Sequence, residues 1–82
     1  MAVLISEHIE TKFMIFKTSL KNEDDLKSIR RHLDEYEQIK RWVVDLEDWE
    51  RVLKIEVTDN LAPQEIEDTL ELLGYVCREM NH

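Results

Sequence analysis

The sequence predicts an α+β sandwich with the ferredoxin-like order βαββαβ, in which two helices lie on one face of a four-stranded antiparallel sheet. Length is the first observation, because 82 residues suffice for one hydrophobic core. The second is the hydrophobic periodicity, which switches between the strand period of two and the helix period of about 3.6. The third is the scarcity of linker residues, since the chain has one glycine and one proline. Together these observations favour a single domain.

Residues 12–20 predict the first strand, and the residues after Asn22 predict the first helix. Along 12–20 the side chains alternate, with Met14, Phe16, Thr18 and Leu20 on one side and Phe13, Ile15 and Lys17 on the other. From Asn22 onward apolar residues recur every three or four positions, and acidic residues precede basic ones, as the helix dipole favours. Asn22 is the predicted N-cap, because its side-chain oxygen can accept a hydrogen bond from a first-turn amide.

Two more strands are predicted at residues 38–46 and 51–58. Trp42 continues the inward parity of its strand, so we expect it in the core. The stretch between the strands, residues 47–50, is short and polar apart from Trp49, which predicts an antiparallel hairpin. Trp49 either folds back over the sheet edge or stands exposed as a contact anchor, and the sequence leaves both interpretations open.

The second helix is predicted to begin near Pro63, because a proline suits the first helical position. It ends at Gly74, since glycine readily takes the left-handed conformation that closes a helix. A last short strand over residues 75–80 follows. Residues 12–82 therefore form the predicted domain, and residues 1–11 form an N-terminal extension that packs on the sheet, pairs with a second copy or frays.

The charge of the chain argues against nucleic acids and membranes as partners. Acidic residues outnumber basic ones 19 to 11, which gives a formal net charge of −8. RNA recognition by this topology needs exposed aromatic side chains on the central strands within a basic field, and we expect neither. No apolar run approaches the roughly 20 residues that a membrane-spanning helix needs. With a lone cysteine, Cys77, and no export signal at its start, the chain is predicted to be cytoplasmic.

Three stretches of the sequence resemble the heavy-metal-associated domain family, the small copper-chaperone fold in its stand-alone bacterial form. They are residues 16–33, 39–57 and 63–76, and the resemblance covers most of residues 13–80. Its most telling parts are the strand at residues 42–46, with the apolar side chains of the next strand opposite, and the Gly74-Tyr75 pair that opens the fourth strand. The resemblance implies the ferredoxin-like fold.

In that family a Met-x-Cys-x-x-Cys loop between the first strand and the first helix binds Cu(I) or Zn²⁺ through two thiolates. The resemblance places Leu20 at the Met position, and Asn22 and Asp25 at the two Cys positions. Both thiolates are therefore absent, and the predicted metal site is degenerate. Tyr75 matches a position that borders the metal in bacterial members of the family.

Other residues of metal-binding or nucleophilic type lack partners at the required spacing. Cys77 is predicted to be a small buried hydrophobic residue. The acidic runs 23–25 and 45–50 lack the glycine of a calcium-binding loop, and no nucleophile accompanies them, so no enzymatic activity is predicted. Metal-ligand spacing is also missing among the three histidines, which are His8, His32 and His82.

The function predicted from the sequence is a small non-catalytic binding module, on a heavy-metal-associated-like scaffold that has lost its thiolates. We expect no cofactor, and contact with a protein partner or a second copy, as a homodimer, through residues such as Trp49 and Tyr75. The open alternative is a metal-ion carrier with carboxylate or histidine ligands, such as Glu23 and Asp25. An enzyme such as an acylphosphatase ranks last, because it requires a glycine-rich phosphate loop and the chain has only Gly74.

Overall fold

Six elements follow one another in the order strand, helix, strand, strand, helix, strand. They belong to a computed structural model that describes residues 11–58 and 61–80. The elements are β1 (Thr11–Thr18), α1 (Glu23–Leu33), β2 (Ile39–Asp45), β3 (Val52–Thr58), α2 (Pro63–Leu72) and β4 (Cys77–Glu79). The strands form one open sheet in the order β2-β3-β1-β4, and each adjacent pair is antiparallel. The predicted α+β class with a four-stranded antiparallel sheet and two helices is therefore confirmed.

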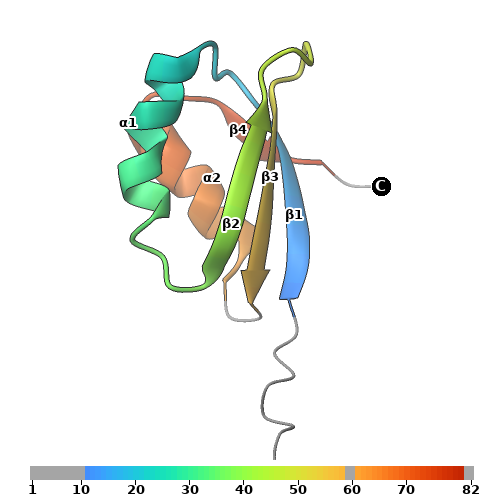
Figure 1. Cartoon of the computed structure of the whole chain (residues 1–82), viewed down its shortest axis with the longest axis vertical. Coiled ribbons are helices and arrows are strands. Elements are labelled where there is room, and N and C mark those ends of the chain that lie inside the picture. Colours follow the sequence, from blue (N-terminus) through green and yellow to red (C-terminus); the bar gives the residue numbers. More distant parts are fainter. Residues whose placement is uncertain (1–10, 59–60, 81–82) are drawn as a thin grey trace, which may run out of the picture.

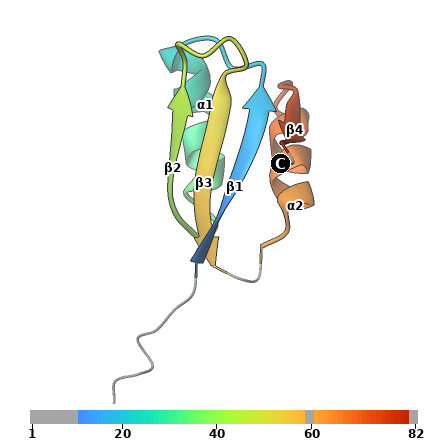
Figure 2. The ribbon, with the colours of Figure 1, turned by 90° about the vertical axis from the view of Figure 1, so that its right-hand side faces the viewer.

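Both helices lie on the same side of the sheet (Figure 1). Seen after a quarter turn, the sheet stands in front of them and its other face is open (Figure 2). The core lies between the two layers and contains twelve buried hydrophobic residues: Met14, Phe16, Leu20, Ile29, Leu33, Leu53, Ile55, Val57, Leu61, Ile66, Leu70 and Cys77. No helix among residues 11–58 and 61–80 combines the length and apolar character needed to span a membrane.

The start of α1 follows the predicted capping chemistry. The backbone N–H of Asp25 donates a hydrogen bond of 3.1 Å to the side-chain oxygen of Asn22, which is the N-cap. Acidic residues occupy the first turn and basic residues the last, in agreement with the helix dipole. Ile29 and Leu33, four positions apart, are buried against the sheet.

The second helix ends in a Schellman motif, which shortens the last strand. Gly74 has a φ of 97°, its N–H bonds to the carbonyl of Glu71, and the N–H of Tyr75 bonds to the carbonyl of Leu70. Tyr75 therefore belongs to the helix cap. For this reason β4 begins at Cys77, and the prediction of a strand from Tyr75 was wrong by two residues.

The other strand ends differ from the predictions by one or two residues. β1 stops at Thr18, because the Thr18 hydroxyl accepts a hydrogen bond from the N–H of Leu20 and turns the chain out of the sheet. The loop between β2 and β3 is longer than predicted and includes Arg51, whose φ of 49° lies in the left-handed region. The N-terminal extension, except Thr11 in β1, lies outside the described residues, as do His8 and His82.

Candidate functional site

The two positions that the resemblance assigns to metal-binding cysteines are occupied by side chains bonded within the chain. Asn22 caps α1, as described above. The two carboxylate oxygens of Asp25 accept one hydrogen bond each, from the N–H of Lys21 at 2.8 Å and from the hydroxyl of Tyr75 at 3.1 Å. This arrangement is a variant of the capping box, in which the third helical residue reaches back to the preceding loop.

A fifth residue, Arg51, fixes the same loop from the β2–β3 connection. Its guanidinium donates to the carbonyls of Lys21 at 3.0 Å and Leu20 at 3.5 Å. Its own carbonyl accepts the Thr18 hydroxyl at 2.6 Å. We call Lys21, Asn22, Asp25, Arg51 and Tyr75 the loop cluster. Its hydrogen bonds use the polar atoms that a metal site at this loop would need.

The structure brings no further ligands to the loop cluster. Within the described part of the chain, no three His, Cys, Asp or Glu side chains lie close enough together to hold a metal ion. His32 lies on α1, where its ring nitrogen is 3.4 Å from the carbonyl of Ser28 in its own helix. Within the described residues, therefore, no histidine completes a metal site with Asp25 and Glu23, the ligands that a carboxylate carrier would use.

Cys77 is fully buried in the core, which agrees with the predicted hydrophobic role. Burial, followed by the nearby carboxylates of Glu67 and Glu71, raises the pKa of the Cys77 thiol to about 12, and Arg78 offsets only part of this shift. The thiol is therefore protonated at neutral pH. A protonated, buried thiol is a poor nucleophile and a poor metal ligand.

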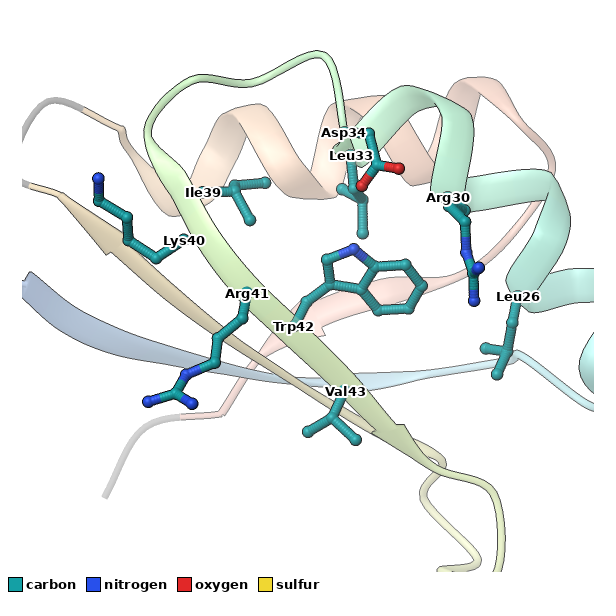
Figure 3. Close-up of a pocket in the computed structure, with 9 residues that line it drawn as sticks. All are labelled: Leu26, Arg30, Leu33, Asp34, Ile39, Lys40, Arg41, Trp42 and Val43. Carbon is teal, nitrogen blue, oxygen red and sulfur yellow. The ribbon is translucent and has the colours of Figure 1, made fainter.

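A groove of about 520 Å³ runs between α1 and the edge strand β2 (Figure 3). We call it the α1 groove. Ile39 and Trp42 point from β2 toward α1, whereas Arg41 and Val43 point to the opposite side of the strand. The residues that line the groove are Leu26, Arg30, Leu33, Asp34, Ile39, Lys40, Arg41, Trp42 and Val43.

The α1 groove combines an aromatic surface with positive charge. Trp42 is half-buried, and the guanidinium carbon of Arg30 lies 5.9 Å from the centre of its ring. No described residue accepts a hydrogen bond from the indole N–H. The groove also carries Lys40, against Asp34 as its one acidic residue, while Arg41 lines it but points its guanidinium to the opposite side of β2 (Figure 3). It is therefore cationic, although the whole chain has a formal net charge of −8.

A second groove, of about 330 Å³, lies on the open face of the sheet, on the other side of β2. We call it the open-face groove. Phe13, 55% exposed, and Val43, 60% exposed, supply its apolar surface. The Lys54 ammonium lies 5.0 Å from the centre of the Phe13 ring. The expectation that no aromatic side chain is exposed on a central strand was wrong, because strand alternation turns Phe13 outward when Met14 is buried.

An ion pair forms the floor of the open-face groove. The Arg41 guanidinium donates to a Glu56 carboxylate oxygen at 2.7 Å, and the Thr11 hydroxyl donates to the other oxygen at 2.9 Å. The bond from Arg41, then that from Thr11, lowers the pKa of Glu56 below its ordinary value. Arg41, Trp42 and Val43 line both grooves, so the grooves flank the same edge strand.

The outer edge of β2 has no pairing partner among the described residues, because β2 is the last strand of the sheet. The ladder between β2 and β3 is interrupted between Ile39 and Arg41, which leaves Lys40 as the extra residue of a bulge. Sequence analysis did not identify Arg30, Lys40 and Arg41 as functional residues. The available signal was the Lys40-Arg41-Trp42 triplet, two cations beside an indole in an acidic chain.

The two residues predicted to contact a partner differ in their surroundings. Trp49 is 85% exposed at the tip of the β2–β3 loop, so of its two predicted placements the exposed one is observed. Tyr75 is half-buried and bonded to Asp25 in the loop cluster. Trp42, predicted to lie in the core, packs against it with one part and lines the α1 groove with another.

No model of a known protein family matches the sequence, and no curated protein matches it. The resemblance to the heavy-metal-associated family remains a prediction from the residues named above.

Proposed function

We propose that this protein is a small, non-catalytic protein-binding module of the cytoplasm, and that its binding surface follows strand β2. The observation that carries this proposal is the pair of grooves on either side of that strand. They expose Trp42, Val43 and Phe13 together with cations, on a surface that nothing in the described chain covers. Exposed aromatic and arginine side chains are typical of protein interfaces.

We further propose that the scaffold is ferredoxin-like and related to heavy-metal-associated domains. The strand order β2-β3-β1-β4 supports the ferredoxin-like part, since β3 separates β1 from β2, and β1 separates β3 from β4, as in split βαβ units. The hydrogen bonds of Asn22 and Asp25 support loss of the metal site, because they give both residues a structural role.

Photocrosslinking inside cells tests the binding surface and captures a partner whose identity is unknown. The residue Val43, which lies between the two grooves, is replaced with p-benzoylphenylalanine, and cells that express the variant are irradiated. We expect one dominant adduct larger than the 9.9 kDa chain. The matched control carries the same group at Leu72, which is 88% exposed on α2, and should give none.

A third position separates the β2 surface from the predicted Trp49 contact. Replacement of Trp49 places the crosslinker at the tip of the β2–β3 loop. An adduct from position 49 and none from position 43 would assign binding to the loop tip instead. If neither position gives an adduct, the result would contradict a binding function for β2 and the β2–β3 loop.

A further inference from the structure

We propose that the partner binds as an extended acidic segment that adds a fifth strand to the outer edge of β2. This inference rests on the proposed binding function and specifies its mode. Beyond Ile39, whose N–H donates to the Tyr36 carbonyl at 3.2 Å, the outer edge of β2 offers backbone N–H and C=O groups at every second residue, because no described strand pairs with it. An extended peptide can satisfy these groups by β-strand addition.

The two grooves lie where the side chains of an added strand would point. Successive residues of a strand project to opposite faces. One alternate set would therefore lie over the α1 groove, beside Trp42 and Arg30, and the other would lie beside Val43 at the β2 side of the open-face groove, with Lys54 one strand further in. Each groove provides an apolar or aromatic surface next to a cation, so each can accept apolar and acidic side chains.

The cations beside β2 favour an acidic segment as the added strand. Arg30 and Lys40 are exposed and form no ion pair with a described residue. Arg41 is paired with Glu56, whereas Lys40 stands at the bulge on the edge itself. Lysine at an edge strand opposes pairing with another strand, unless the added strand carries the opposite charge. A second copy would bring its own Lys40 to the same edge, whereas an acidic segment would neutralise the Lys40 and Arg30 already there.

The direct test measures binding of a labelled seven-residue peptide, the length of β2, in which glutamate and valine alternate. Fluorescence anisotropy should show saturable binding that weakens with added salt. The same peptide with lysine in place of glutamate should not bind. Equal binding of the two peptides, or no binding of the acidic one, would overturn the inference.

Backbone methylation distinguishes strand addition from simple charge attraction. In one acidic peptide every second amide is N-methylated, and in another the complementary amides are methylated. Strand addition predicts that one set abolishes binding and that the other leaves it intact, because only alternate amides face the edge. If both methylated peptides bind like the parent, the peptide does not pair with β2.

Protein variants locate the site. Arg30→Glu and Lys40→Glu should each raise the Kd by about tenfold, as expected when a favourable contact to a carboxylate becomes a repulsive one. Lys27→Glu is the matched control, since Lys27 is an exposed cation of α1 that does not line the α1 groove, and it should change the Kd by less than about twofold. Equal effects of all three would show long-range attraction without a site at β2.

Two further outcomes have defined meanings. Sedimentation of the free protein should give a monomer, and a dimer that Lys40→Glu dissociates would make a second copy the occupant of the edge. Crosslinking at position 43 without peptide binding would overturn strand addition and leave the binding function standing. Absence of both would overturn both proposals.

Discussion

The loop cluster and the outer edge of β2 use their polar groups in opposite ways. In the loop cluster, the Asp25 carboxylate, the Asn22 oxygen and the Arg51 guanidinium are all bonded to other parts of the chain. Along β2, no described strand pairs with the outer edge, although at the start of the strand the Ile39 N–H donates to the carbonyl of Tyr36 at 3.2 Å. The comparison teaches that polar residues bonded to one another within the chain stabilise a loop, whereas an unpaired edge strand leaves its polar groups free for a partner.

The strongest expected effect concerns the thiol of Cys77, which is buried in the core at the start of β4. The unfolded chain ionises Cys77 near its ordinary pKa of 9.0, whereas the folded chain holds the proton to about pH 12. Stability is therefore unaffected by this group below pH 9.0 and falls as pH rises above it, by up to about 1.4 kcal/mol per pH unit. Urea unfolding of wild type and Cys77→Ala across that window measures the difference.

Cys77→Ala is the reference for wild type, because it lacks the titrating thiol. Its free energy of unfolding should therefore fall less than that of wild type as the pH rises. Parallel curves for the two proteins would show that the thiol ionises without unfolding. In that case a thiolate could form in the folded chain, and the core around Cys77 would be less closed to water than the structure indicates.

A smaller effect is expected from Asp25→Ala, which removes the acceptor for Lys21 and Tyr75. We expect a loss of about 1–2 kcal/mol in the free energy of unfolding. The control is Asp24→Ala, an exposed first-turn residue of α1, which should lose only the helix-dipole contribution of about 0.3–1 kcal/mol. Equal losses would mean that the loop cluster adds nothing to α1.

Metal titration of wild type, Asp25→Ala and Asp24→Ala tests whether the loop cluster has kept a metal site. Wild type should bind neither Zn²⁺ nor Mn²⁺ stoichiometrically, because both Asp25 oxygens already accept hydrogen bonds. Stoichiometric binding that Asp25→Ala abolishes and Asp24→Ala retains would restore the carboxylate carrier as the better explanation.

On the β2 side, Arg30→Ala should cost about 0.5–1 kcal/mol through loss of its contact with the Trp42 ring. Arg31→Ala, the adjacent exposed residue of α1, is the control and should be neutral within about 0.5 kcal/mol. Both are measured by urea unfolding in a Trp49→Phe background, so that Trp42 is the remaining tryptophan. Identical unfolding curves for Arg30→Ala and Arg31→Ala would show that the contact between Arg30 and the Trp42 ring adds no measurable stability.

The smallest effect is expected for Glu56→Gln. Because Arg41 lowers the pKa of Glu56, the ion pair stabilises the fold above the ordinary value of 4.5, and this contribution is lost as the pH falls below it. The Tm of wild type should therefore fall more steeply than the Tm of Glu56→Gln as the pH is lowered. An equally steep decline in the variant would assign the acid sensitivity to other carboxylates.

The fold could be predicted because its signals are local. Alternation in β1, the Asn22 cap and the Gly74 stop each depend on a few neighbouring residues, and each has its expected role in the structure. The strand ends shifted where side chains intervened, as at Thr18, whose hydroxyl turns the chain.

The candidate site was only partly predictable, because it assembles residues from separate elements. The hydrogen bond between Tyr75 and Asp25 joins residues fifty positions apart, and the contact between Arg30 and Trp42 joins a helix to a strand. Neither pairing leaves a periodic signal in the sequence. The bulge at Lys40 leaves only a weak signal, a step of three residues between the inward-facing Ile39 and Trp42 where strict alternation would give two.

The central position of β1 determines when the protein can finish folding. β1 is made first among the strands, yet its partners are β3 and β4, and the pair Phe16 and Glu79 joins nearly opposite ends of the sequence. During synthesis one side of β1 therefore waits, with its amides unpaired, until residues 77–79 have left the ribosome. Nascent chains stalled on C-terminal linkers that keep residues 77–79 inside the exit tunnel or place them outside it should differ sharply in resistance to protease.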